Sequence, residues 1–297
     1  MEKDPVKIVD LLKSGKVVFS CELFPPKAGT HLDHAKTIVE KIAAINPTFM
    51  SVTYGAGGGT VARTVEIADM IQNQYQVPSL AHLTCVSSSK EVITHTLDKL
   101  LDKNIHNVLA LRGDLPKDQQ FPNQNEFRYA SELIEFIKTY GDFCIGGACY
   151  PEGHVDSKNK EKDIKYLKLK ADAGCDFFTT QMFFDNHIFY NFLYRTLSKG
   201  IQVPIVAGIM PVVNSNQIER ICALSGTNLP PRFKAIVDKF SDNPDAMKQA
   251  GIAYATEQII DLIANGVNCI HLYTMNQPDI ASSIASNLSD IIAGKKV

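Results

Sequence analysis

One acidic side chain interrupts an otherwise apolar segment near the start of the chain. Residues 17–24 run Val-Val-Phe-Ser-Cys-Glu-Leu-Phe, and Pro25 and Pro26 end the segment. A strand of that composition is typically buried, so Glu22 carries a desolvation cost unless another group partners it or the protein uses it. Neighbours that raise the pKa of a buried carboxyl make such a group a proton donor at neutral pH. Glu22 is therefore a candidate acid catalyst, and the alternative is a structural acid paired with an arginine, a lysine or a backbone amide.

Polar side chains also stand at the ends of other apolar segments. They are Thr53 and Tyr54, His82, Arg112-Gly113-Asp114, Tyr150 and His154, Thr180 and Gln181, and His271, Tyr273 and Thr274. Singly, each has an ordinary explanation: His82 as a core histidine, for example, or Arg112 and Asp114 as an ion pair. Together they are hard to explain by stability, because desolvating so many polar groups is costly. A ligand site is the more economical interpretation.

Eight short apolar segments, each followed by a helical pattern, organise the chain. The expected strands are 17–23, 49–54, 80–85, 108–111, 144–150, 177–183, 204–210 and 270–274. The helices that follow them are 31–45, 60–74, 89–103, 126–139, 156–173, 186–198, 214–224 and 278–292. Nearly continuous hydrophobicity is typical of strands buried on both faces. Glycines at 141, 174, 200 and 266 each end a helical pattern.

Successive strand–helix units require parallel strands joined by right-handed crossovers. We therefore predict an α/β fold, a (β/α)8 TIM barrel forming one catalytic domain over residues 1–297, with an N-terminal helix at 4–12. Extra helices at 230–240 and 244–264 precede the eighth strand. A doubly wound open sheet is the alternative, but its Gly-x-Gly-x-x-Gly fingerprint is absent. Barrel active sites lie at the carboxyl ends of the strands, so the polar residues should meet at one mouth.

Composition narrows the function classes. The chain of 297 residues is 45% hydrophobic and 21% charged with a net charge of −2, which argues against nucleic acid as a partner. No apolar stretch approaches the roughly 18 residues of a membrane span, and the charged start lacks a signal-peptide core. The seven cysteines are scattered and the histidines lack metal-ligand spacing. We expect a cytoplasmic protein with no metal site and no membrane association.

The strand-end motifs resemble those of the methylenetetrahydrofolate reductase family, a family of flavin-containing (β/α)8 barrels. The matching motifs follow the family order across nearly the whole chain. They are Glu22-Leu23-Phe24-Pro25-Pro26, Ser51-Val52-Thr53-Tyr54-Gly55-Ala56, His82-Leu83-Thr84-Cys85, Leu111-Arg112-Gly113-Asp114, Tyr150-Pro151-Glu152, Thr180-Gln181 and Tyr273-Thr274. No single motif is diagnostic, but seven in register are highly specific.

The resemblance implies two half-reactions at one flavin, which is FAD or alternatively FMN. NADH or NADPH reduces the flavin, and the flavin then passes a hydride to 5,10-methylenetetrahydrofolate, which becomes 5-methyltetrahydrofolate in one-carbon and methionine metabolism. Glu22 matches the general acid that protonates N10 of the substrate. Asp114 matches a catalytic carboxylate between flavin and pterin, and Gln181 matches a substrate-binding amide, so Glu22, Asp114 and Gln181 are the expected substrate contacts.

The same matching assigns a set of flavin contacts. They are Thr53, Tyr54, Ala56, His82, Arg112, Gly113, Asp114, Ala130, Tyr150 and His154. Asp163 and Lys170 align with positions that hold the ribose and diphosphate, and a spacing of seven places them on one helix face.

Two positions depart from the family pattern. Ser215 stands about where well-known members place an aromatic that stacks on folate or nicotinamide, and Gln277 stands where some have an arginine near the folate tail. We also expect a homo-oligomer. Two alternatives stay open: a flavoprotein subunit fed with electrons by a partner protein, and a barrel lyase or aldolase. The second requires a lysine at a strand end, and no predicted strand supplies one.

Overall fold

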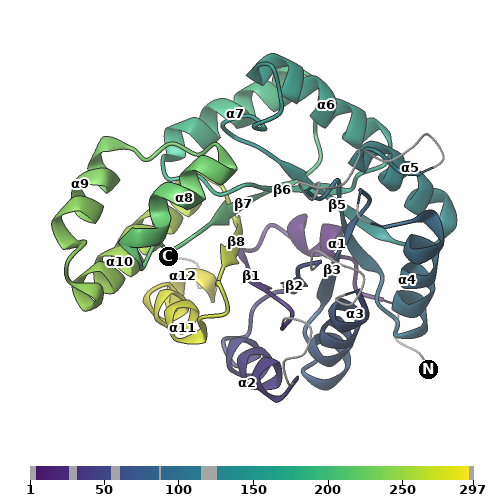
Figure 1. Ribbon diagram of the computed structural model, residues 1–297, viewed down its shortest axis with the longest axis horizontal. Helices are drawn as coiled ribbons and strands as arrows, with labels where there is room; N and C mark the ends of the chain where they lie inside the picture. The colour runs from purple at the N-terminus through teal and green to yellow at the C-terminus, as the bar shows by residue number, and fades with distance from the viewer. Residues whose placement is uncertain (1–4, 27–31, 55–60, 87, 115–125, 294–297) are drawn as a thin grey trace.

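Eight parallel strands close into a barrel at the centre of the molecule (Figure 1). The computed structural model describes residues 5–26, 32–54, 61–86, 88–114 and 126–293. The strands are β1 (Val18–Leu23), β2 (Met50–Val52), β3 (Ser79–Thr84), β4 (Asn107–Leu111), β5 (Cys144–Cys149), β6 (Phe177–Thr180), β7 (Ile205–Ile209) and β8 (Cys269–Tyr273). Each pairs with the next, and β8 pairs with β1. The predicted (β/α)8 barrel is confirmed.

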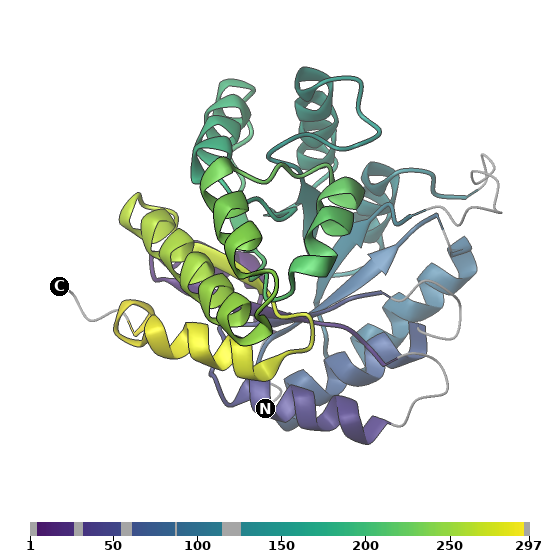
Figure 2. The ribbon, with the colours of Figure 1, turned by 60° about the vertical axis from the view of Figure 1, so that its left-hand side comes forward.

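The helices lie around the outside of the barrel, apart from the first, which lies across one end of it (Figures 1 and 2). They are α1 (Ile8–Leu12), α2 (Leu32–Ala43), α3 (Val61–Asp69), the π-helical turn η1 (Met70–Gln74), α4 (Lys90–Asp102), α5 (Ala130–Tyr140), α6 (Lys160–Asp172), α7 (Asn186–Ser198), α8 (Ser215–Ser225), α9 (Pro231–Phe240), α10 (Pro244–Ala264), α11 (Pro278–Asn287) and α12 (Ser289–Ile292). The N-terminal helix and the extra helices before β8 are thus present as predicted. None of these helices, within the described part of the chain, has the length and apolar character of a membrane span.

The sixth strand ends earlier than the apolar segment that predicted it. β6 stops at Thr180, although residues 181–183 were expected to continue it. Met182 instead belongs to a cluster with Phe184, Phe233 and other side chains of the α8–α10 insert. Phe183 packs in the main core, where its ring stacks on that of Phe189. The apolar residues after Thr180 thus serve packing outside the strand, so hydrophobicity alone overstates the length of the strand.

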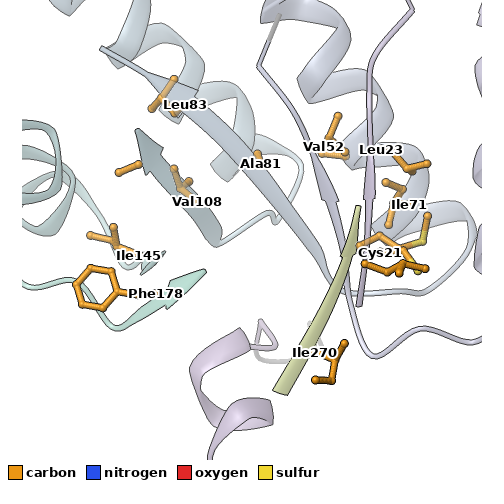
Figure 3. Packing of buried hydrophobic residues seen from close by; sticks show 14 of the residues in the cluster. Cys21, Leu23, Val52, Ile71, Ala81, Leu83, Val108, Ile145, Phe178 and Ile270 are labelled. Atoms are coloured by element: carbon orange, nitrogen blue, oxygen red, sulfur yellow. The ribbon is translucent and has the colours of Figure 1, made fainter. Parts of the chain in front are cut away.

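Alternation along β1 decides which of its side chains enter the barrel. Cys21 and Leu23 point outward and pack with Val52 and Ile71 in the layer between strands and helices (Figure 3). Because successive strand residues face opposite sides, Glu22 points into the barrel. The fold therefore places the carboxylate inside the ring of strands, at the end where β1 leaves it.

The other end of the barrel interior is filled with apolar side chains. This floor comprises Ile8, Leu12, Val18, Phe49, Leu80, Leu109, Cys144, Phe177 and Val206. Helix α1 supplies two of its members and is held there because the Ile8 N–H donates to Asn107 Oδ1 at 2.9 Å. Gly146 leaves room for the floor, since a Cβ there would lie 2.5 Å from the Phe177 ring. The polar residues of the mouth thus rest on a packed base.

Helix α10 makes a close contact that gives a test of the packing. A Cβ on Gly251 would lie 1.9 Å from the carbonyl oxygen of Val212, in the segment after β7. Helix propensity alone would make Gly251→Ala favourable by about 1 kcal/mol. Because the helix must move to relieve the clash, we expect this change to lower the free energy of unfolding by about 1–3 kcal/mol instead.

Denaturant unfolding of Gly251→Ala measures this effect. The matched control is Ala253→Gly on the exposed side of the same helix, which should cost about 1 kcal/mol through propensity alone. A Gly251→Ala protein more stable than the wild type would contradict the close packing of α10 on Val212.

Candidate active site

Glu22 lies at the mouth of the barrel between two imidazoles. The residue is 7% exposed, and its strand neighbours in register are Ser51 of β2 and Tyr273 of β8. Its Oε2 is 3.7 Å from His82 Nε2 and 3.8 Å from His271 Nε2. Among the described residues, no lysine or arginine forms an ion pair with this carboxylate. The site therefore lacks the cationic partner that a structural ion pair would need.

Hydrogen bonds fix the orientation and tautomer of His271. Ser20 Oγ donates its one proton to the Ile270 carbonyl at 3.0 Å, so the same oxygen accepts from His271 Nδ1–H at 2.7 Å. This assignment leaves His271 Nε2 with its lone pair. That nitrogen is 3.2 Å from Ser51 Oγ, from which it can accept, and it also faces Glu22. His271 is thus a fixed imidazole whose Nε2 lies 3.8 Å from Glu22 Oε2.

His82 is a buried, neutral imidazole on the other side of Glu22. Burial lowers its pKa to about 4, although the nearby Glu22 carboxylate acts in the opposite direction. Its Nε2 is buried without a hydrogen-bond partner in the described part of the chain. A buried polar atom of this kind is costly unless a ligand engages it. His82 Nε2 is therefore available to form a hydrogen bond with a ligand at the mouth.

Tyr273 forms a fixed wall beside Glu22. Its hydroxyl donates to the Thr180 carbonyl at 2.5 Å, which joins β8 to β6 across β7. The side chain crosses β7 at Gly208, where a Cβ would lie 2.6 Å from the hydroxyl oxygen. Burial of the hydroxyl and the Glu22 charge together raise the pKa of Tyr273 well above its usual value. The hydroxyl is therefore a neutral hydrogen-bond donor, not a base.

A second cluster of polar side chains extends from the mouth toward α6. Arg112 Nη2 lies 2.9 Å from Asp156 Oδ2, so the interpretation of Arg112 and Asp114 as an ion pair is wrong: Asp156 is the partner. The Tyr150 and His154 rings meet edge to face at 4.6 Å. Burial, and then the Arg112 charge, lower the pKa of His154. The segments that follow β4 and β5 thus converge on one side of the mouth.

Asp163 and Lys170 share the inner side of α6. Burial raises the pKa of Asp163 and lowers the pKa of Lys170, against their mutual attraction. The Lys170 ammonium donates to the Ala148 carbonyl and lies 5.6 Å from the centre of the Phe178 ring. A half-buried ammonium with a lowered pKa is a group that an anionic ligand would stabilise.

The remaining predicted site residues occupy the rim. Tyr54 Oη is 2.8 Å from Ser88 Oγ, and Thr53 follows β2 directly. Gly113 has a φ of +82°, and a Cβ there would lie 2.9 Å from Thr84 Cβ, so only glycine fits this turn. Gln181 Oε1 accepts from the Met182 N–H at 3.0 Å.

Four further positions complete the comparison with the sequence. Asp114 is exposed, but its charge helps to raise the pKa of Tyr150. Ala130 is the first residue of α5. Ser215 begins α8 and its hydroxyl donates to the Ser241 carbonyl at 3.3 Å. Ala56 lies outside the described residues.

The structure brings Glu22 and His82 together as expected, and it adds a residue that the assignment from sequence omitted. His271 stands at the end of the predicted eighth strand, but the sequence alone assigns no role to it or to its partners Ser20 and Ser51. The signal was present, because Ser20 and Glu22 alternate onto the same face of β1. The strand register that pairs Ser20 with His271 could not be inferred from composition.

The fold and the site define a (β/α)8 barrel with an acid–imidazole cluster in the mouth where barrel enzymes place their catalysts. Among the described residues, no group of histidine, cysteine and acidic side chains is arranged to hold a metal ion. Comparison with known proteins identifies the family within this class of barrels. The family model for methylenetetrahydrofolate reductase matches residues 7–289, and the chain belongs to that family.

Individual relatives agree with this membership. The chain is 38% identical over 307 residues to methylenetetrahydrofolate reductase (NADH) 1 of Arabidopsis thaliana, covering 98% of this chain and 52% of that protein. It is 32% and 31% identical to the 5,10-methylenetetrahydrofolate reductases of Pectobacterium carotovorum and Escherichia coli, covering 92% of this chain and 91% of each enzyme. The chain thus spans about half the length of the plant relative and nearly all of the bacterial ones.

A solved structure shares the fold at low sequence identity. It is a Clostridium thermocellum protein that binds two copies of 5-methyl-5,6,7,8-tetrahydrofolic acid. The superposition has a TM-score of 0.65 at 15% identity and covers 97% of this chain and 99% of that one. At this identity the likeness supports the barrel fold alone.

The lowered pKa of His82 gives a pH-dependent stability. The unfolded chain takes up a proton at this residue near pH 6.5, whereas the folded protein does so only near pH 4. The unfolded state therefore binds more protons between these values, and the free energy of unfolding falls as the pH drops from about 6.5 to about 4. The contribution from His82 is on the order of 3 kcal/mol.

Denaturant unfolding measured across this pH range tests the assignment. His82→Gln should remove this part of the pH dependence, while His95→Gln on the exposed side of α4 should leave it in place. An unchanged pH dependence in His82→Gln would show that His82 is not held neutral by burial.

Proposed function

We propose that this protein is a flavin-dependent reductase that converts 5,10-methylenetetrahydrofolate to 5-methyltetrahydrofolate, with NAD(P)H reducing the flavin. The observation that carries the proposal is the buried Glu22 carboxyl, which faces the mouth between two imidazoles without a cationic partner among the described residues. Family membership gives this acid a substrate class. NADH is favoured as the donor because the names of the plant relatives specify it.

The second cluster of polar side chains, between the mouth and α6, fits a flavin with an anionic tail. Arg112, Tyr150 and His154 would lie against the ring system, and the half-buried Lys170 ammonium would gain a further charge partner in a diphosphate. His82 Nε2, which lacks a hydrogen bond within the described chain, would gain one from a ring heteroatom. We favour FAD over FMN because Asp163 and Lys170 extend the group along α6. When bound, the flavin supplies hydride transfer between the two substrates.

The protein's own residues supply the proton and the orientation. Glu22 protonates N10 of the substrate, so that the imidazolidine ring opens and its methylene carbon becomes an electrophilic iminium. His271, held in place by Ser20 and Ser51, lies 3.8 Å from the same carboxyl and borders the space that the acid faces. Asp114 and Gln181, on the rim, bind the pterin, and the Asp114 charge favours the cation. Apolar side chains fill the other end of the barrel interior, so these steps take place at the mouth.

The visible spectrum of the purified protein tests the cofactor. We expect flavin absorption, and release of FAD on denaturation of the protein, because the cationic and aromatic groups described above suit it. A colourless protein that cannot be reconstituted with either FAD or FMN would refute the proposal.

Glu22→Gln tests the role of the acid. The amide keeps the size of the side chain but cannot donate an acidic proton, so the half-reaction with methylenetetrahydrofolate should slow by about 10²-fold or more. Flavin content and flavin reduction by NADH should stay near the wild-type values. Stopped-flow absorbance follows the two half-reactions separately.

The matched control is Glu40→Gln, which makes the same change on the exposed face of α2 and should alter neither half-reaction. If Glu22→Gln instead lost flavin while folate reduction by the remaining holoenzyme was normal, Glu22 would be a structural acid.

A further inference from the structure

The turn that follows β8 holds the end of β1 with side-chain hydrogen bonds. Asn276 Oδ1 accepts from the Phe24 N–H at 2.9 Å, and Asn276 Nδ2 donates to the Phe24 carbonyl at 3.0 Å. Thr274 Oγ1 donates to the Glu22 carbonyl at 2.6 Å. One turn therefore binds the backbone at the catalytic acid itself and two residues after it, where the barrel ladder gives way to a loop.

The backbone of this turn adopts a conformation that residues with side chains disfavour. Met275 and Asn276 have φ values of 52° and 57°, in the left-handed region. Within the turn, the Asn276 N–H donates to Thr274 Oγ1 at 3.2 Å. Such strain persists when the surrounding structure requires it, and it concentrates at functional sites. Here the left-handed pair directs the Asn276 amide back onto β1.

The residue that Asn276 holds is the last point at which β1 can donate a backbone hydrogen bond before the chain turns away. Pro25 and Pro26 carry no N–H and cannot continue a ladder. Phe24 itself is 37% exposed, so its side chain contributes limited packing. The Asn276 amide thus replaces the strand pairing that the prolines prevent.

We propose that Asn276 is a positioning residue for Glu22, a role that rests on the proposed function. It fixes the exit of β1, so that the Glu22 carboxyl stays aimed at the mouth between His82 and His271. Without the clamp, the strand end would be free to shift, and a misplaced acid protonates its substrate less efficiently. Asn276 itself need not touch the substrate.

Asn276→Gly is the informative variant because it removes both hydrogen bonds to Phe24 while glycine accepts a φ of 57° without strain. The matched control is Asn46→Gly, which makes the same change at a φ of 56° in the connection before β2, at the opposite end of the barrel. Thermal unfolding and flavin reduction by NADH report whether each barrel is intact.

We expect Asn276→Gly to slow the half-reaction with methylenetetrahydrofolate by about 10-fold or more at saturating substrate, with flavin reduction unchanged. Its pH profile should shift as well, since the environment of the acid changes. In a Glu22→Gln background the Asn276→Gly change should cause little further loss, because both act through one group. The Asn46→Gly protein should match the wild type in both half-reactions.

Three outcomes would overturn the role. Loss of equal size in Asn46→Gly, or full additivity with Glu22→Gln, would show that Asn276 acts through stability or independently of the acid. A flavin-loaded wild-type protein that does not reduce methylenetetrahydrofolate would overturn the proposed function, and the positioning role with it.

Discussion

The inward direction of Glu22 is the constraint on which the rest of the site depends. Strand alternation sets it, because Cys21 and Leu23 on either side are committed to the apolar layer beneath the helices. A shift of one residue in β1 would place the acid in that layer and a thiol in the mouth. Pairing with β2 and β8 prevents this shift, since β1 is bonded along both edges. The chemistry therefore rests on the register of one strand.

The barrel makes the polar mouth possible by concentrating its stability elsewhere. Apolar side chains fill the floor of the interior and the layer between strands and helices. The desolvated group at the mouth (His82, His271 and Glu22) is not arranged as an ion pair and contributes little evident stability. Such local costs are tolerated where a protein keeps groups ready for a ligand. The Lys170 ammonium on α6 is a second example, because desolvation lowers its pKa.

Much of the fold and part of the site could be predicted from the sequence, and the limits have physical causes. The eight strands are visible because strands buried on both faces are nearly all apolar, and a carboxylate within such a segment is conspicuous. The Arg112–Asp156 pair was not predictable, because the choice of partner depends on how two loops meet in space. The place of His271 in the site is hidden for a related reason: it depends on a strand register with Ser20 that no local sequence pattern encodes. The end of β6 is predicted too late in the chain, because the apolar residues that pack against an insert resemble those that would extend a strand.

The insert between β7 and β8 has an evolutionary consequence. Gly208 and Ile209 of β7 pair directly with His271 and Leu272 of β8, so the helices α8, α9 and α10 leave and rejoin the barrel at adjacent strands. The pairing that closes the barrel between β7 and β8 is made by residues outside the insert. The exposed faces of these helices are thus free to diverge, whereas the faces that pack on Met182 and Tyr273 are not, and Ser215 lies at the start of the insert. Selection can therefore change the outer surface of the insert while the strand register that directs Glu22 is kept.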